Sequence, residues 1–189
     1  MSRYTANLSP QESPASQRID KTALEEEIRP YYAPMRSISG FIGPRSWLSN
    51  THMATLLADG ILYPSAEHAF LASRTNDPGL RRDIAQALSI THAGRLIRNL
   101  KINPEWRQTS TAIMLEILRA KFSDPALAAE LVDTGTVPLI NLNYWGDRHW
   151  GAEAEGTVLH GGNRLGHCLM QVRTEQFAAR NQVPARRKG

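Results

Sequence analysis

The sequence has one cysteine and no long apolar run, and each shortage excludes a class of protein. Cys168 cannot form an internal disulfide, and a lone cysteine excludes a zinc site built on CxxC pairs. No apolar stretch approaches the ~18 residues of a membrane-spanning helix. The first sixteen residues are polar, contain Pro10 and Pro14, and fit neither a secretory signal nor a transit sequence. We therefore expect a protein of the reducing cytoplasm, with no membrane partner.

Acidic residues are also in short supply, with 18 Asp and Glu against 22 Lys and Arg. Most of this excess lies at the C-terminal end, because residues 175–189 hold four bases and one acid. The net charge of +4 is therefore weak support for a nucleic-acid-binding surface. The 41% of hydrophobic residues among 189 is enough for the core of one domain.

The distribution of apolar residues predicts an α+β fold that is mostly helical, in three regions. Residues 1–36 form a flexible extension with a short helix over 19–28, 37–178 form the domain, and 179–189 form a basic tail. Helices are expected over 66–74, 79–88, 91–100, 105–122, 126–135 and 164–181. The small strand component comprises a hairpin around Asp59-Gly60 and an extended segment over 137–145, and 146–163 is expected to be a glycine-rich loop.

Local capping signals support these helices. Ser65 follows Pro64 and can cap a helix that begins at Ala66, Thr91 can cap the third helix, and Gly135 can close the fifth. In the long helix over 105–122, apolar residues recur at helical spacing, which predicts that one face lies in the core.

The residues alone leave the chemistry open. Glu67 and Arg74 share a helix face, but an acid in a first turn and a solvated arginine explain them equally well. Trp145 can be a ligand platform or a packing residue. Cys168 lies in an apolar run and is expected in the core, and the histidines lack metal-ligand spacing, so no metal site is predicted.

A series of short motifs in fixed order is more specific. The series runs WLSN, GILYPSAEHAFLASR, Trp106, LRAKF, DTG, YWGD and GNRLGHCLMQVR. In this order they resemble the YbiA-like NADAR family over about residues 40–175. The resemblance implies a single YbiA-like domain that acts as an N-glycosidase on ADP-ribose-like or ribosyl-amine substrates, without cofactor or metal. Family members cleave early riboflavin-pathway intermediates, or remove ADP-ribose from guanine bases and pair with a toxin.

The resemblance also implies the site residues. Glu67 and Asp147 match the catalytic positions, and the positions matched to substrate binding are Trp47, Asn50, Arg74, Lys121, Trp145, Gly146 and Asn163. Cleavage of an N-ribosyl bond develops positive charge at the anomeric carbon, which we expect Glu67 to stabilise. In such a site Trp145 would stack on a base, and Arg74 and Lys121 would hold phosphate.

Two departures from the family pattern affect the expected mechanism. Arg74 stands where the resemblance has a lysine, and an arginine cannot form a Schiff base. Asn141 stands where many relatives have an acid. Two functions therefore remain: an N-glycosidase for either substrate, or a non-catalytic module that binds ADP-ribose or another NAD derivative.

Overall fold

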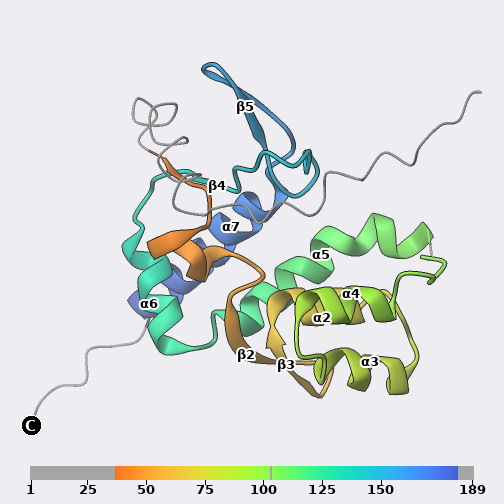
Figure 1. Ribbon diagram of the computed structural model, residues 1–189. Helices are drawn as coiled ribbons and strands as arrows, with labels where there is room; N and C mark the ends of the chain where they lie inside the picture. The colour runs from red at the N-terminus through yellow and green to blue at the C-terminus, as the bar shows by residue number, and fades with distance from the viewer. Residues whose placement is uncertain (1–36, 103, 183–189) are drawn as a thin grey trace, which may run out of the picture.

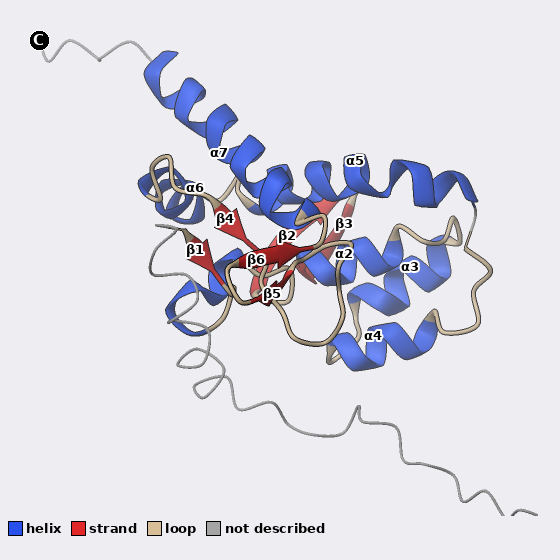
Figure 2. Cartoon of the chain, turned by 90° about the horizontal axis from the view of Figure 1, so that it is seen from above, coloured by secondary structure: helices blue, strands red, loops and turns tan. Residues whose placement is uncertain are grey.

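Two long helices, packed against each other, support the other elements. The computed structural model describes residues 37–102 and 104–182 (Figure 1). Helix α5 (Pro104–Lys121) packs on α7 (Arg164–Gln182), and both run along one side of the molecule in Figure 2. The shorter helices pack beside them: α2 (Ala66–Ala72), α3 (Pro78–Ala85) and α4 (Ile90–Leu96) form one group next to α5, and α6 (Pro125–Asp133) lies on α7.

The strands form three small two-stranded sheets. They are β1 (Ile38–Ser39) with β4 (Leu139–Ile140) in parallel, β2 (Met53–Ala58) with β3 (Ile61–Ser65) antiparallel, and β5 (Glu153–Glu155) with β6 (Val158–His160) antiparallel. A 3-10 helix, η3 (Gly43–Leu48), joins β1 to the segment that leads into β2. This architecture confirms the predicted α+β class with mostly helical content.

The predicted hairpin lies where the Asp-Gly pair indicated. Asp59 and Gly60 both have positive φ, at 48° and 75°, as the two central residues of a tight hairpin turn require. Ser65 caps α2 as predicted, because its side chain accepts a hydrogen bond from the backbone N–H of His68. Gly135 follows α6 with φ 67°, the left-handed position that ends a helix.

A continuous core forms where α5, α7 and the N-terminal elements meet. Met114 and Leu118 of α5 are fully buried, together with Phe122 just after this helix and Leu169 and Val172 of α7. This confirms the expected core face of α5. Cys168 is buried, as its apolar surroundings predicted.

Several predicted boundaries were wrong. The helix expected over 79–88 ends at Ala85, and α4 begins at Ile90 because Ser89, not Thr91, accepts the capping bond from His92. Only Leu139–Ile140 of the segment 137–145 is a strand, and the expected loop 146–163 contains β5 and β6. Strand β4 pairs with the distant β1, which leaves no local signal, whereas β5 and β6 form a local hairpin around Gly156-Thr157 that the sequence analysis missed.

Other predictions concern segments outside the described residues. The helix expected over 19–28 and the tail residues 183–189 are among them. Within the described ranges, no helix is both long and apolar enough to cross a bilayer.

Candidate active site

The first turn of α2 fixes Glu67 against the segment that follows η3. The capping Ser65 hydroxyl lies 2.7 Å from Nδ1 of His68, so the start of the helix is held in the interior. The backbone N–H of Glu67 donates to the carbonyl of Asn50 at 2.9 Å. The strand, the cap and this bond together place Glu67 beside Asn50.

Three polar side chains act on the Glu67 carboxyl. Burial raises the pKa of this carboxyl above its ordinary value, and the charge of the Asp147 carboxylate raises it further. The Arg74 guanidinium and a hydrogen bond with the Asn50 side chain lower the pKa and so oppose this rise. Glu67 and Asp147 therefore lie within electrostatic range of each other, although 80 residues separate them in sequence.

Lys121, in the last turn of α5, supports the backbone segment that leads to Asn50. The Lys121 ammonium donates to the carbonyl oxygens of Trp47 at 2.6 Å and Ser49 at 2.7 Å, the residues that flank Leu48 just before Asn50. The lysine is only 1% exposed, and burial lowers its pKa to about 7. Its position corrects the expected phosphate contact, because the ammonium faces the protein interior and supports the backbone that carries Asn50.

Trp47 also lies in the core rather than at the surface. Its ring meets Phe122 edge-on, with the centroids 6.2 Å apart. The expected substrate contact of Trp47 is therefore replaced by a packing role next to Lys121.

Arg74 lies on an aromatic surface at the other end of α2. Its guanidinium carbon is 5.1 Å from the ring centroid of Trp106 and 5.7 Å from that of Phe70. The Trp106 indole N–H donates to the hydroxyl of Ser73 at 2.9 Å, which fixes the ring. Among the described residues Arg74 forms no ion pair, and its buried Nε has no hydrogen-bond partner.

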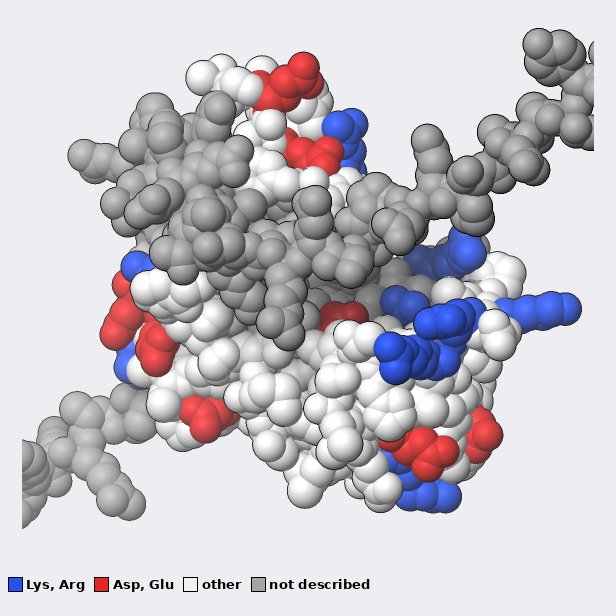
Figure 3. Space-filling model, viewed as in Figure 1, with Lys and Arg blue, Asp and Glu red and all other residues white. Residues whose placement is uncertain are grey.

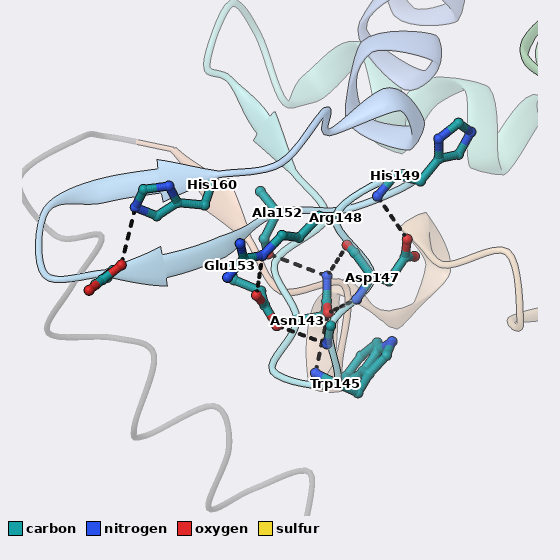
Figure 4. Close-up of polar contacts among 10 residues, drawn as sticks. Asn143, Trp145, Asp147, Arg148, His149, Ala152, Glu153 and His160 are labelled. Atoms are coloured by element: carbon teal, nitrogen blue, oxygen red, sulfur yellow. Dashed lines mark hydrogen bonds and ion pairs between the residues drawn. The ribbon is translucent and has the colours of Figure 1, made fainter.

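A fully buried asparagine, Asn143, organises the loop that carries Trp145 and Asp147 (Figure 4). Its Oδ1 accepts the backbone N–H groups of Trp145 at 3.3 Å and Asp147 at 3.0 Å. Its Nδ2 donates to the carbonyl oxygens of Asp147 at 2.8 Å and Ala152 at 3.3 Å. The sequence analysis missed this residue, although a polar residue two positions before Trp145 at the end of an apolar run was a usable signal.

Asp147 uses one carboxylate oxygen to complete the same loop. Its Oδ1 accepts the backbone N–H groups of His149 at 3.1 Å and Trp150 at 2.9 Å. No hydrogen bond to Oδ2 is present within residues 37–102 and 104–182, so this oxygen can face a substrate. Gly146 has φ 83° and donates its N–H to Glu153 at 2.8 Å, so its role here is to allow the turn.

The two tryptophans of this loop differ in their environment. Trp150 packs edge-on against Phe70, with centroids 5.1 Å apart. Trp145 is 58% exposed, and Figure 4 shows its ring projecting out of the loop. Of the two roles that the sequence left open for Trp145, core packing is excluded.

Asn163 ties the start of α7 to β4. Its Oδ1 accepts the N–H of Asn141 at 2.9 Å, and its Nδ2 donates to the carbonyl of Leu139 at 2.9 Å. A Cβ at Gly166 would collide with that same carbonyl oxygen, so only glycine fits there. The Asn163 amide is thus engaged with the backbone of β4 and Asn141, and its expected substrate contact stays a prediction.

Comparison with known proteins identifies the family to which this chain belongs. The family model for the NADAR domain matches residues 37–176. The chain belongs to the NADAR family. N-glycosidase YbiA of Escherichia coli (strain K12) is 30% identical over 170 residues, which cover 86% of this chain and 96% of that protein. Riboflavin biosynthesis protein VVA0006 of Vibrio vulnificus (strain YJ016) is 31% identical over 132 residues, 68% of this chain and 35% of that protein.

A solved structure agrees with the NADAR assignment. The NMR structure of the E. coli protein YbiA superimposes with a TM-score of 0.68 at 28% sequence identity. The match covers 82% of this chain and 93% of that one. The NADAR domain here therefore has the YbiA-like fold that the motif series implied.

In this NADAR domain the predicted site residues fall into two groups. Glu67, Asn50, Arg74 and Asp147 lie together, with Trp145 on the same loop as Asp147. The second group, formed by Trp47, Lys121 and Asn163, supports the backbone behind them. Among the residues that the structure describes, no group of three or more His, Cys, Asp or Glu could hold a metal ion. The chemistry that this site offers is that of two carboxyl groups and one guanidinium.

Proposed function

We propose that this protein is an N-glycosidase. It hydrolyses an N-ribosyl bond of a substrate that lies between the carboxyl groups of Glu67 and Asp147. The observation that carries the proposal is the pairing of a partly buried carboxyl, whose pKa burial raises, with a second carboxylate within electrostatic range. Two carboxyl groups in different environments are what glycoside hydrolysis requires. The names of the E. coli and Vibrio relatives agree with this chemistry.

The raised pKa of Glu67 divides the roles between the two acids. A carboxyl that holds its proton more readily is suited to protonate the leaving nitrogen as the bond to the anomeric carbon breaks. Asp147, through its free Oδ2, then faces the cationic ribosyl group and takes a proton from the attacking water. The remaining hydroxide oxygen bonds the anomeric carbon, which yields ribose phosphate or ADP-ribose and a leaving group whose nitrogen carries the proton from Glu67. This division differs from the sequence-based expectation, which gave Glu67 the charge-stabilising role.

Arg74 limits the mechanism to direct hydrolysis. An arginine stays protonated and cannot form an imine with the ribose, so no covalent Schiff base arises at this position. Its guanidinium, fixed on Trp106, is suited to an anionic group of the substrate. We propose a small ribosyl-amine phosphate or an ADP-ribosylated guanine as the substrate, and a cytoplasmic setting in keeping with the single buried thiol. The pairing with a toxin stays a prediction.

Product release tests the proposal. The purified protein is incubated with a ribosylaminopyrimidine phosphate, and free aminopyrimidine and ribose phosphate are measured. Separately, it is incubated with ADP-ribosylated guanine DNA, and free ADP-ribose is measured. We expect product release from one of the two substrates, and Glu67→Gln to slow that release by ~10²-fold. Tight binding of either compound with no release from it would instead favour the non-catalytic binding module.

A further inference from the structure

Four exposed arginines follow one another from α4, over the start of α5, to the start of α7. Arg95 lies in the last turn of α4, and Arg98 lies in the turn just after this helix. Arg107 is in the first turn of α5, and Arg164 is the first residue of α7. Figure 3 shows basic side chains gathered over α4 and the beginning of α5. We call these four residues the arginine track.

The last member of the track lies beside the loop that carries Asp147. Arg164 donates to the hydroxyl of Thr111 at 3.1 Å, and Thr111 lies one turn along α5 from Arg107 on the same face of the helix. The residue after Arg164 donates its backbone N–H to the carbonyl of Trp150 at 3.1 Å. Trp150 in turn donates its backbone N–H to Asp147. The track therefore leads from α4 to the loop of the candidate active site.

The arginines of the track form no ion pair with another residue of the described part of the chain. Elsewhere on the molecule four arginines each pair with a carboxylate: Arg81, Arg119, Arg148 and Arg180. Between Ile90 and Arg107 the sequence contains one acid, Glu105. The surface over α4 and the start of α5 therefore keeps a net positive charge.

The helix dipoles account for the arginines at the end of α4 but not for Arg107. A base near the C-terminus of a helix is favourable, because the dipole places negative charge there. Arg107 is the fourth residue of α5, at the opposite end of a helix, where the same dipole disfavours a cation. A bound anion would offset this cost. The position of Arg107 therefore indicates binding rather than a contribution to stability.

The arrangement fits a polymer of phosphates better than a single small anion. Arginines that are spread over three helices can bind successive phosphates of one strand, each through a pair of parallel hydrogen bonds. At the catalytic end of the track, the exposed ring of Trp145 offers a face to a base. A positive path combined with an exposed aromatic ring is typical of proteins that bind single-stranded nucleic acid.

We propose that the arginine track binds the phosphate backbone of a single-stranded nucleic acid and presents its modified base to Glu67 and Asp147. The inference rests on the proposed function for the reaction itself. It selects the ADP-ribosylated nucleic acid from the two substrates named above. It also extends the contacts beyond the ADP-ribose group, so an unmodified strand should bind as well.

Binding of an unmodified strand tests the track separately from catalysis. A fluorescent single-stranded oligonucleotide is titrated by anisotropy, at several salt concentrations, into the natural chain and two double variants. Arg98→Gln/Arg107→Gln removes two charges of the track, and the control Arg45→Gln/Arg180→Gln removes two exposed arginines of η3 and α7. We expect the track variant to bind about tenfold or more weakly, with a slope of log affinity against log salt that is smaller by ~1.4, or ~0.7 for each lost phosphate contact. The control should match the natural chain, and all three melting temperatures should agree.

Equal affinity and equal salt slope of the track variant and its control would overturn the track. Binding of the natural chain to anionic phospholipid vesicles but not to the oligonucleotide would overturn it as well. Both results concern binding alone and leave the proposed reaction standing.

Turnover separates the track from the proposed reaction. The track variant should raise KM for an ADP-ribosylated oligonucleotide and leave the release of ADP-ribose from ADP-ribosylated guanosine unchanged. Binding of the strand through the track with no product release from any of the substrates named here defeats only the N-glycosidase. Release from the oligonucleotide that the track variant leaves unchanged, or release from the ribosylaminopyrimidine phosphate alone, defeats only the track.

Discussion

At the scale of single residues, the surroundings of Glu67 affect both its proposed role in proton transfer and the stability of the fold. Burial and the Asp147 charge raise its pKa, so the ionised form is disfavoured in the folded state. The folded chain then binds more protons at this group than the unfolded chain, and stability falls as pH rises through the ordinary carboxyl range. The raised pKa that suits Glu67 to the proposed role of proton donor therefore also lowers stability as pH rises.

Glu67→Gln should separate these two effects. The amide cannot ionise, so the melting temperature of the variant relative to the natural chain should rise between pH 4 and pH 8. Base release should fall by ~10²-fold over the same range, because the proton donor is gone. Thermal unfolding across pH and a product assay check both results. A melting-temperature difference that does not change with pH would contradict the raised pKa.

Trp145 provides a second residue-scale prediction. Its exposed ring makes it available for stacking, so Trp145→Ala should weaken ligand binding by ~1–3 kcal/mol with little change in melting temperature. Trp150→Ala is the matched control, because Trp150 packs on Phe70 and its loss should lower stability instead. If Trp145→Ala lowers the melting temperature as far as Trp150→Ala does, the stacking role is wrong.

At the scale of elements, the end of α5 sets the position of the segment that carries Asn50. Lys121 bonds two carbonyl oxygens of that segment from a buried position. Because burial lowers its pKa to about 7, the folded chain binds fewer protons here than the unfolded chain between about pH 7 and the ordinary lysine range. The destabilisation from Lys121 is therefore complete below pH 7 and disappears as pH rises.

Lys121→Met keeps the length of the side chain but removes its donors. We expect kcat to fall by ~10-fold or more while KM changes little, because Asn50 and Glu67 are displaced slightly from their working geometry. The stability of the variant relative to the natural chain should be greatest below pH 7. Lys101→Met, at an exposed position in the loop after α4, is the control, and it should change neither kcat nor stability. An increase in KM alone would indicate substrate contact by Lys121 instead.

The sequence predicted elements that have a local signal and missed those that do not. The cap at Ser65 and the Asp59-Gly60 turn are local, and both features lie where they were expected. The pairing of β1 with β4 joins Ile38 to Leu139, which are about a hundred residues apart, so no short window shows it. The burial of Lys121 was also missed, because a lysine at the C-terminal end of a helix is typically solvated and nothing local to it shows which segment covers it. The meeting of Glu67 and Asp147 came from the family resemblance and not from spacing.

At the scale of the whole molecule, basic side chains gather on one part of the surface although the net charge is small. Figure 3 shows Lys and Arg side chains gathered over α4 and the beginning of α5. Arg95, Arg98, Lys101 and Arg107 are the exposed bases of this region, and none forms an ion pair with another described residue. The sequence analysis placed most of the excess charge in the tail and so did not anticipate this basic face.

Deletion of residues 1–18 and 183–189 tests whether the NADAR domain is sufficient. The site residues discussed above lie between Trp47 and Asn163, and the family match covers 37–176, so the shortened chain should keep the melting temperature and ADP-ribose affinity of the full chain. Base release from the small phosphorylated riboside should also be unchanged. The shortened chain loses five bases, Arg3, Arg18, Arg186, Arg187 and Lys188, and one acid, Glu12, but it keeps the basic face over α4 that an ADP-ribosylated DNA substrate would meet. Its activity at rising salt should therefore match that of the full chain. A selective loss of the DNA reaction in the shortened chain would show instead that the terminal segments take part in holding the nucleic acid.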